Sequence, residues 1–344
     1  GQTSLVTISF SEAVSGFTLA DLTVANGTLS GLSSVDGGVT WTATLTPASG
    51  ITDTSNLITL DNSGVSDAAG NAGSGSTASN NYSIDSQRPT ATIVLADSAL
   101  RAGETTQVTI TFSEAVNGLD LADLSAQNGT LANLASSDGG ITWTATFTPA
   151  LAVQDASNVI SLNNSGIADL AGNVGTGTTQ SANYTVNTVL PSATIVVADN
   201  ALRAGESSLV TITFSEAVSG FDNSDLSVSN GSLSAVSSSD GGVTWTATFT
   251  PAANVEDASN LISLDNSGVV GASGNAGVGT TDSNNYAIDT QRPAASIVVA
   301  NSSLGAGQTS LVTISFSEAV SGFTLADLTV ANGTLSGLSS VDGG

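Results

Sequence analysis

The strongest constraint on this chain is an internal repeat. Residues 1–38 return unchanged at 307–344, and diverged copies start at Gly103 and Gly205, so successive copies begin 102 residues apart. Solenoid units are shorter, roughly 20 to 50 residues, whereas this period matches a domain that folds by itself. The sequence therefore predicts a tandem array of domains with boundaries at 1–88, 89–190, 191–292 and 293–344.

The two outer repeats are expected to be partial. The first lacks its opening strand, and the last contains only its first four strands. Because both ends fall inside a repeat, we expect the sequence to be a segment of a longer array. The interpretation below therefore concerns the repeating unit and its junctions.

Composition excludes several classes of function. The chain carries 29 acidic residues, four arginines and no lysine, for a net charge of −25, and such a chain attracts neither nucleic acid nor an anionic membrane surface. It contains no Cys, His or Met. Thiolate and imidazole metal sites, disulfides and His-based catalysis are thereby excluded, and no enzymatic activity is expected. What remains for a metal is oxygen ligation, which favours Ca²⁺ or Mg²⁺.

Each repeat is predicted to contain seven short strands. The segments are rich in β-branched residues or alternate apolar and polar side chains, and none shows a long helical period. In the second repeat they are 90–96, 106–112, 124–127, 130–135, 141–148, 157–163 and 183–187. Asn128-Gly129 predicts a two-residue hairpin between the third and fourth strands. The predicted class is all-β, with one two-sheet sandwich per repeat.

The alternating direction of these strands predicts which loops meet at a junction. In the second repeat, the loop with Glu114, the Asp138 hairpin and the long loop (165–177) would lie at the end that receives the first linker (84–89). Asp85 of this linker would then meet Glu114, Asp169 and the side chain of Asn173. Carboxylates, an amide and backbone carbonyls are ligands that suit Ca²⁺. Asp123 is a candidate further ligand. The corresponding candidates elsewhere are Glu12, Asp67, Asn71, Glu216, Asp289 and Glu318.

An ordinary turn is the alternative explanation of these acids. Asp169-Leu-Ala-Gly172-Asn173 also fits a loop in which Asp caps the turn and Gly or Asn is left-handed. Asp123 and its counterparts are as well explained by turn capping as by metal binding. Both alternatives stay open at the level of sequence.

Comparison of the repeats with one another favours a shared site. The linker position is Asp85, Asn187 and Asp289 in turn, while the long-loop position is Asp67, Asp169 and Gly271. The two losses, Asn187 and Gly271, fall at the same junction, between the second and third repeats, so a weaker or empty site is predicted there. Arg88 and Arg292, each before a linker proline, are expected to neutralise nearby acids, and the alternative role is to bind a partner.

The motifs together resemble a known family. GE…VTITFSEAV, DGG-x-TWTATFTP, D-x-AGN and NYTV, at a period near 100, are similar to the bacterial immunoglobulin-like repeats of giant surface adhesins, including RTX adhesins exported by type I secretion. The resemblance covers essentially the whole chain and implies immunoglobulin-like sandwiches. It further implies Ca²⁺ at or near domain junctions, which supports Asp67, Asp85, Glu114, Asp169, Glu216, Asp289 and Glu318 as ligands.

The expected function is therefore that of an extender. Such a segment is an extracellular, monomeric rod at the bacterial surface that holds ligand-binding domains away from the outer membrane, and its partners are calcium ions and neighbouring repeats. Two other classes stay open. One is an adhesion module that binds a glycan or a host protein through its loops, and the other is a spacer that needs no metal.

Overall fold

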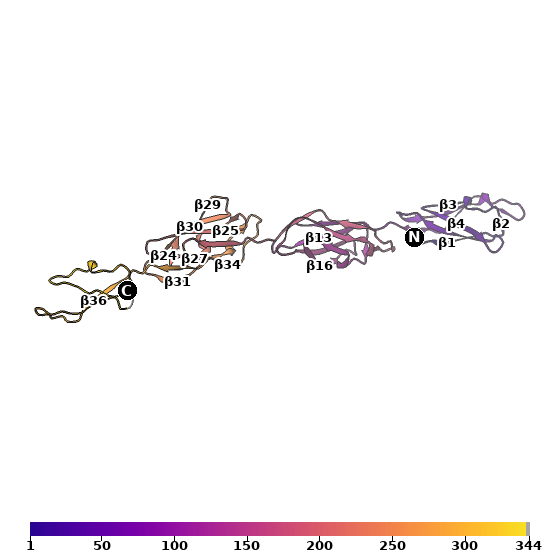
Figure 1. Cartoon of the computed structure of the whole chain (residues 1–344). Coiled ribbons are helices and arrows are strands. Elements are labelled where there is room, and N and C mark those ends of the chain that lie inside the picture. The colour runs from indigo at the N-terminus through magenta and orange to yellow at the C-terminus, as the bar shows by residue number, and fades with distance from the viewer. Residues whose placement is uncertain (342–344) are drawn as a thin grey trace. The chain divides into compact units, whose positions relative to one another are not determined.

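The computed structural model describes residues 1–341, which form β-strands and short 3-10 turns (Figure 1). The chain divides into two compact units, Gly1–Val189 and Leu190–Gly344, and each is described by itself. The first unit contains the first and second repeats, and the second unit contains the third and fourth. In the part of the chain that the structure describes, every helix is a three-residue turn, too short to cross a membrane.

The second repeat shows the complete architecture. One layer is an antiparallel four-stranded sheet in the order β11-β13-β17-β16. The strands opposite it form the groups β12-β22-β18, β15-β19-β21 and β14-β20, and β12 pairs with β22 in parallel. The bounds are β11 (Ala91–Leu95), β12 (Ala99–Arg101), β13 (Thr106–Phe112), β14 (Val116–Asn117), η3 (Leu121–Asp123), β15 (Leu124–Ala126), β16 (Gly129–Ser136), β17 (Thr142–Pro149), β18 (Gln154–Asn158), β19 (Ile160–Asn163), η4 (Asn164–Gly166), β20 (Ala168–Asp169), β21 (Thr178–Gln180) and β22 (Tyr184–Asn187).

The other repeats follow the same plan. The first contains β1 (Ser4–Ser9), β2 (Val14–Ser15), η1 (Leu19–Asp21), β3 (Leu22–Val24), β4 (Gly27–Ser34), β5 (Thr40–Pro47), β6 (Thr52–Asn56), β7 (Ile58–Asp61), η2 (Asn62–Gly64), β8 (Ser66–Asp67), β9 (Ser76–Ala78) and β10 (Tyr82–Asp85). The third contains β23 (Ala193–Val197), β24 (Ala201–Arg203), β25 (Ser208–Phe214), β26 (Val218–Ser219), η5 (Asn223–Asp225), β27 (Leu226–Val228), β28 (Gly231–Leu233), β29 (Ser237–Ser238), β30 (Thr244–Pro251), β31 (Glu256–Asn260), β32 (Ile262–Asp265), η6 (Asn266–Gly268), β33 (Val270–Gly271), β34 (Thr280–Asp282) and β35 (Tyr286–Asp289).

The fourth repeat has fewer strands than predicted. Its described residues form β36 (Ala295–Val299), β37 (Val312–Phe316) and η7 (Leu325–Asp327), which gives two strands instead of four. In the first repeat, the segments equivalent to the two missing strands are β3 and β4, which pair with β7 and β5. The equivalents of β5 and β7 fall after the last residue of the printed sequence, so those pairings are not available here.

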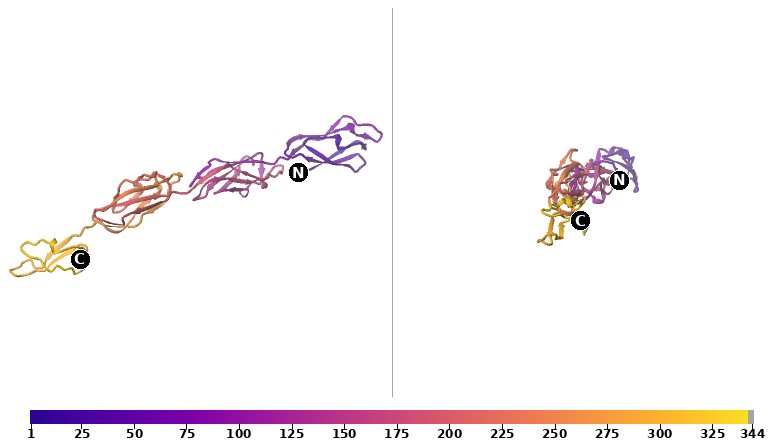
Figure 2. Two further views of the ribbon diagram at one scale, coloured as in Figure 1. Left: turned by 45° about the horizontal axis from the view of Figure 1, so that its top comes forward. Right: turned by 60° about the vertical axis from the view of Figure 1, so that its left-hand side comes forward.

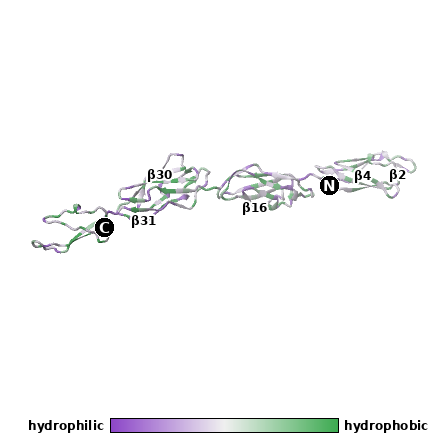
Figure 3. Cartoon of the chain, viewed as in Figure 1, coloured by the Kyte–Doolittle hydropathy of each residue, from purple (hydrophilic) through white to green (hydrophobic). Residues whose placement is uncertain are grey.

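Each complete repeat buries a core between its layers. In the second repeat, Ile110 and Phe147 of the four-stranded sheet pack with Leu162 and Tyr184 of the opposite layer, and all four side chains are fully buried. The Phe147 and Tyr184 rings meet edge to face at 5.2 Å, and the Tyr184 hydroxyl donates to the Gln127 carbonyl. Buried residues alternate with more exposed ones along β13, and Figure 3 shows green, hydrophobic stretches within the strands of this repeat. This alternation places one face of each strand in the core.

Two predictions about strand pairing are wrong. Asn128-Gly129 does not close a hairpin, because β15 pairs with β19 and β16 pairs with β17, so the chain changes sheets at this dipeptide. The predicted strand 157–163 is two strands, β18 and β19, which belong to different groups. Figure 2 shows the strands of the second repeat, in magenta, from two further directions.

Candidate metal centre at the first junction

Glu114 and Asp169 are brought together by one short pairing. Glu114 lies in the turn that follows β13, and the chain then enters β14, which pairs with β20 so that Val116 lies opposite Asp169. The N–H of Val116 also donates to the Gly140 carbonyl at 3.1 Å, which fixes this turn against the β16–β17 hairpin. The predicted grouping of these three loops at one end of the repeat is therefore confirmed.

Asp169 closes the long loop on itself. Its Oδ1 accepts from the backbone N–H of Asn173 at 2.8 Å, and its Oδ2 accepts from the Asn173 side-chain amide, also at 2.8 Å. Gly172 provides the left-handed conformation that this turn needs, with φ of 88°. The Asp169 side chain is only 2% exposed. The turn predicted from sequence is thus present, and it holds a buried carboxylate.

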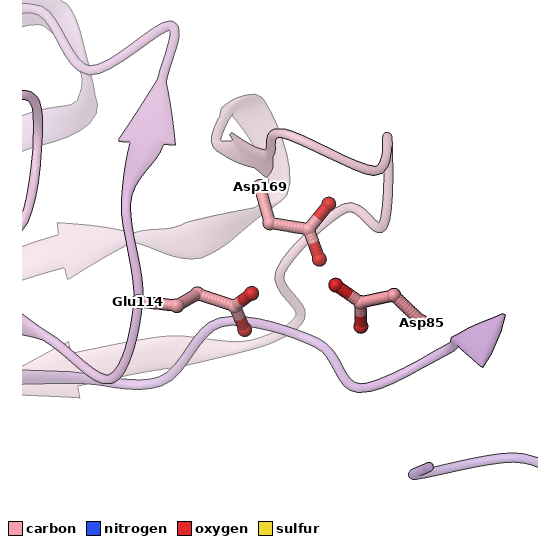
Figure 4. Close-up of side chains that lie close together, drawn as sticks. All are labelled: Asp85, Glu114 and Asp169. Carbon is pink, nitrogen blue, oxygen red and sulfur yellow. The ribbon is translucent and has the colours of Figure 1, made fainter. Parts of the chain in front are cut away.

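The first linker brings the third carboxylate. Asp85 is the last residue of β10, and one oxygen from each of Asp85, Glu114 and Asp169 lies within 4.8 Å of the other two. Figure 4 shows the three carboxylates pointing toward one another, two from the second repeat and one from the end of the first. Asp85 is exposed, Glu114 is half-buried and Asp169 is buried. The sequence-based prediction that these three acids meet is confirmed.

The electrostatics of this acidic cluster, defined as Asp85, Glu114 and Asp169, are unfavourable for three negative charges. Burial raises the pKa of Glu114, and the nearby charges of Asp169 and Asp85 raise it further. A carboxyl whose pKa is raised in this way resists ionisation until a positive charge arrives. A divalent cation would supply that charge.

Asn173 connects the long loop to the linker. Besides binding Asp169, its amide nitrogen donates to the backbone carbonyl of Asp85 at 3.1 Å. The predicted ligand role concerned the oxygen of this side chain, while the observed contacts are made by its nitrogen. Asn173 therefore positions Asp169 and the linker relative to each other.

Asp123 has a different position from the acidic cluster. It is the third residue of η3, where its Oδ2 accepts from the backbone N–H of Asp120 at 3.0 Å, and Asp120 in turn caps the same turn. Of the two explanations open at the level of sequence, the geometry favours capping. Asp21, Asp225 and Asp327 make the same capping box in their repeats.

The first repeat has the same long-loop turn. Asp67 accepts from the N–H of Asn71 at 2.8 Å and from its side-chain amide at 2.7 Å, and these hydrogen bonds lower the pKa of Asp67. Glu12, Asp67 and Asn71 line one surface pocket. The turn is therefore a property of the repeat, and the linker carboxylate is what the first junction adds.

The third repeat replaces the acid with an internal contact. Gly271 stands where the second repeat has Asp169, and the Glu216 carboxylate accepts from the Ser273 N–H at 3.0 Å and from its hydroxyl at 3.3 Å. A Cβ at Gly271 would lie 2.6 Å from the Glu216 Cδ, so the glutamate fills the space of the missing side chain. Ser273 was not predicted. Its signal is that the other two repeats have Ala69 and Ala171 at this position.

The fourth repeat supplies one further predicted ligand. Glu318 is half-buried, and its Oε1 is buried and accepts no hydrogen bond from the residues that the structure describes. Asp289, at the end of β35, is exposed. The position equivalent to Asp169 falls after the last residue of the printed sequence.

Comparison with known families agrees with this architecture. The family model described as "Bacterial Ig-like domain" matches at residues 1–84, 85–186, 187–288 and 289–344. The chain belongs to the bacterial Ig-like domain family. These boundaries lie four residues before those predicted from the sequence, because they assign each linker to the repeat that follows it. The expected all-β array of immunoglobulin-like domains is thereby confirmed.

The solved structures that match this chain include two bacterial adhesins and a titin tandem. The Escherichia coli adhesin FdeC is 15% identical, with 83% of this chain and 91% of that chain covered and a TM-score of 0.33. The Yersinia pseudotuberculosis adhesin InvE is 15% identical, with coverages of 58% and 59% and a TM-score of 0.23. The I9–I11 tandem of titin is 10% identical, with coverages of 84% and 92% and a TM-score of 0.30. The search among curated proteins gave no match.

Proposed function

We propose that this bacterial Ig-like array is an extender segment of a bacterial surface adhesin, in which Ca²⁺ at domain junctions fixes one repeat against the next. The observation that carries the proposal is the acidic cluster at the first junction, whose ligand oxygens lie within 4.8 Å of one another. The cluster draws on two repeats, so an ion bound there would hold both. Export by type I secretion and membership of the RTX adhesins belong to the same proposal.

The donor set fits a hard cation. The residues available are three carboxylates and nearby backbone carbonyls, and the chain contains no Cys or His that would favour zinc. Ca²⁺ accepts six to eight oxygens in flexible geometry, whereas Mg²⁺ requires a near-ideal octahedron and keeps several waters. A cluster with one exposed, one half-buried and one buried carboxylate suits the less demanding ion. Calcium is therefore the proposed ligand.

The mechanism follows from charge. Without an ion, Asp85 is repelled by Glu114 and Asp169, and this repulsion favours separation of the linker from the second repeat. An ion that binds only when all three carboxylates are together stabilises the docked state by mass action. The array is then expected to be loose in the low-calcium interior of the cell and stiffer outside it.

The third repeat is expected to respond differently. Its Glu216 is held by Ser273, and the carboxylate of Asp169 has no counterpart at Gly271. Calcium would have to displace these hydrogen bonds to recruit Glu216. We therefore infer that calcium stabilises the second repeat more strongly than the third.

Small-angle scattering of the whole chain, in calcium and in chelator, tests the proposal. Calcium is expected to raise the mean maximum dimension and narrow its spread in the wild-type chain. Asp85→Asn together with Asp169→Asn should remove the contribution of the first junction to both effects. The matched control is Asp120→Asn, which changes an exposed capping acid of the same repeat and leaves the acidic cluster intact. Identical scattering of the wild type with and without calcium would show a spacer that needs no metal.

A further inference from the structure

The first linker is held by two hydrogen bonds that need no ion. The Arg88 guanidinium donates to the backbone carbonyl of Val174, and the Asn173 amide donates to the backbone carbonyl of Asp85 at 3.1 Å. The two contacts come from adjacent residues of the long loop. Both acceptors are backbone oxygens, so neither contact uses a carboxylate of the acidic cluster.

Arginine is rare in this chain, which makes its placement informative. There are four arginines and no lysine in 344 residues, and Arg88 and Arg292 occupy the same position in their linkers, directly before proline. These are the linkers that carry Asp85 and Asp289. The remaining linker has Leu190 at this position. Arginine therefore occurs in the two linkers that carry an aspartate, and it is absent from the linker that has Asn187 instead.

We propose that Arg88 is a positioning residue that docks the first linker on the long loop in the absence of metal, and thereby assembles the acidic cluster before an ion arrives. The docking role stands on the Arg88 contact alone. The consequence for calcium rests on the proposed function.

Two opposing interactions act on the first linker, repulsion between carboxylates and the hydrogen bond of Arg88. Three like charges within 4.8 Å push Asp85 away from Glu114 and Asp169. A guanidinium bound to a carbonyl is a charge-assisted hydrogen bond, stronger than a neutral one, and it acts three residues along the linker from Asp85. Because Asn173 is closed onto Asp169, the loop that receives Arg88 also fixes the buried carboxylate. Docking the linker therefore places Asp85 beside Asp169.

The competing explanation is that Arg88 serves as a counter-charge to the acids, as expected from the sequence alone. In that case arginine would take the place of the ion, and its removal would strengthen calcium binding. The contact with a carbonyl favours docking instead. The two explanations predict opposite changes in calcium affinity, so one set of variants distinguishes them.

The experiment measures the distance between the first two repeats in the full chain. The chain has no cysteine, so Leu57→Cys and Val94→Cys place one spin label in each repeat at exposed sites (44% and 61% exposed) away from the cluster. Distance distributions are recorded by pulsed electron paramagnetic resonance in chelator and in calcium. Arg88→Leu is compared with Arg88→Lys, which keeps one donor, and with Arg292→Leu, the same change at another linker.

In chelator, Arg88→Leu is expected to broaden the distribution, Arg88→Lys to restore it in part, and Arg292→Leu to leave it unchanged. Calorimetric titration should show calcium affinity at the first junction falling about tenfold in Arg88→Leu, about 1.4 kcal/mol. An unchanged distribution in chelator overturns the proposal, with or without tighter calcium binding. If Arg88→Leu broadens the distribution but the wild-type chain binds no calcium, the docking role is supported and only the metal site is refuted.

Discussion

Replacement of Glu114 by glutamine should make the second repeat more stable in chelator and insensitive to calcium. The change removes one of the three charges of the acidic cluster and keeps the shape of the side chain. Two of the three repulsive pairs disappear with it, those with Asp169 and with Asp85. The same substitution removes an ion ligand. Glu114→Gln should therefore stabilise the second repeat in chelator and remove the stabilisation that calcium gives to the wild type.

The magnitude follows from the separation of the carboxylates. Two unit charges 4.8 Å apart repel by about 0.9 kcal/mol in water and by about 3.5 kcal/mol at an effective dielectric constant of about 20. Because Asp85 is exposed, the value for water applies, and removing two repulsive pairs then stabilises the second repeat by about 2 kcal/mol. For a domain of this size, such a gain raises the melting temperature by roughly 10 °C.

The assay uses the single tryptophan of each of the first three repeats. With Trp41→Phe and Trp245→Phe, the fluorescence of Trp143 reports unfolding of the second repeat alone, so the transitions of the other repeats do not contribute. Trp143 donates to the Gly140 carbonyl at 3.1 Å, at the same end of the repeat as the cluster. Glu216→Gln in the same background is the matched control, and it should not move this transition.

Two results would refute this reasoning. If Glu114→Gln melts at a lower temperature than its parent in chelator, the carboxylates do not destabilise the docked state. If calcium raises the melting temperature of Glu114→Gln as much as that of its parent, Glu114 is not a ligand.

Three further predictions concern pH, the third repeat and the corner between the sheets. The pKa of Glu114 is raised above its ordinary value of 4.5, so the folded state binds this proton more tightly than the unfolded state does. In chelator, the free energy of unfolding of the second repeat should therefore fall as the pH rises from 4.5 through the raised pKa. Glu114→Gln should remove this part of the pH profile. Gly271→Asp should displace Glu216 from its hydrogen bonds and lower the free energy of unfolding of the third repeat by about 1.5 to 3 kcal/mol in urea titrations followed by Trp245; an unchanged midpoint would contradict the close contact seen there. Asn128→Ala should lower the free energy of unfolding of the second repeat by about 3 kcal/mol, because Asn128 combines a left-handed backbone (φ 51°) with hydrogen bonds to Asp155 and Asn158. Asn133 is an exposed left-handed residue (φ 57°), and Asn133→Ala should lower it by only about 1 kcal/mol. Equal losses in the two variants would assign the effect to backbone strain alone.

Sequence reasoning succeeded where the signal is local. The alternation in β13 and β17 reflects strands with one face in the core, and the Asp138 hairpin between β16 and β17 forms as predicted. The meeting of Glu114 with Asp169 followed from strand direction, since strands that alternate in direction gather alternate loops at one end. These inferences needed no knowledge of which strands pair.

It failed where pairing partners are distant in sequence. Asn128 adopts the left-handed conformation expected of a hairpin turn, but the same conformation serves a corner, and β15 finds its partner in β19. The strand β18 contains the polar sequence QDASN, so its pairing with β22 leaves no hydrophobic pattern to recognise. The contact of Glu216 with Ser273 joins residues 57 positions apart, and its only signal in the sequence is the comparison with Ala69 and Ala171 in the other repeats.

The central claim is that a calcium ion binds between Asp85, Glu114 and Asp169. Anomalous diffraction from calcium-loaded crystals of the whole chain tests it most directly. We predict an anomalous peak within bonding distance of all three carboxylates, about 2.3 to 2.6 Å from their oxygens. A map with no peak among these oxygens at saturating calcium would contradict the claim.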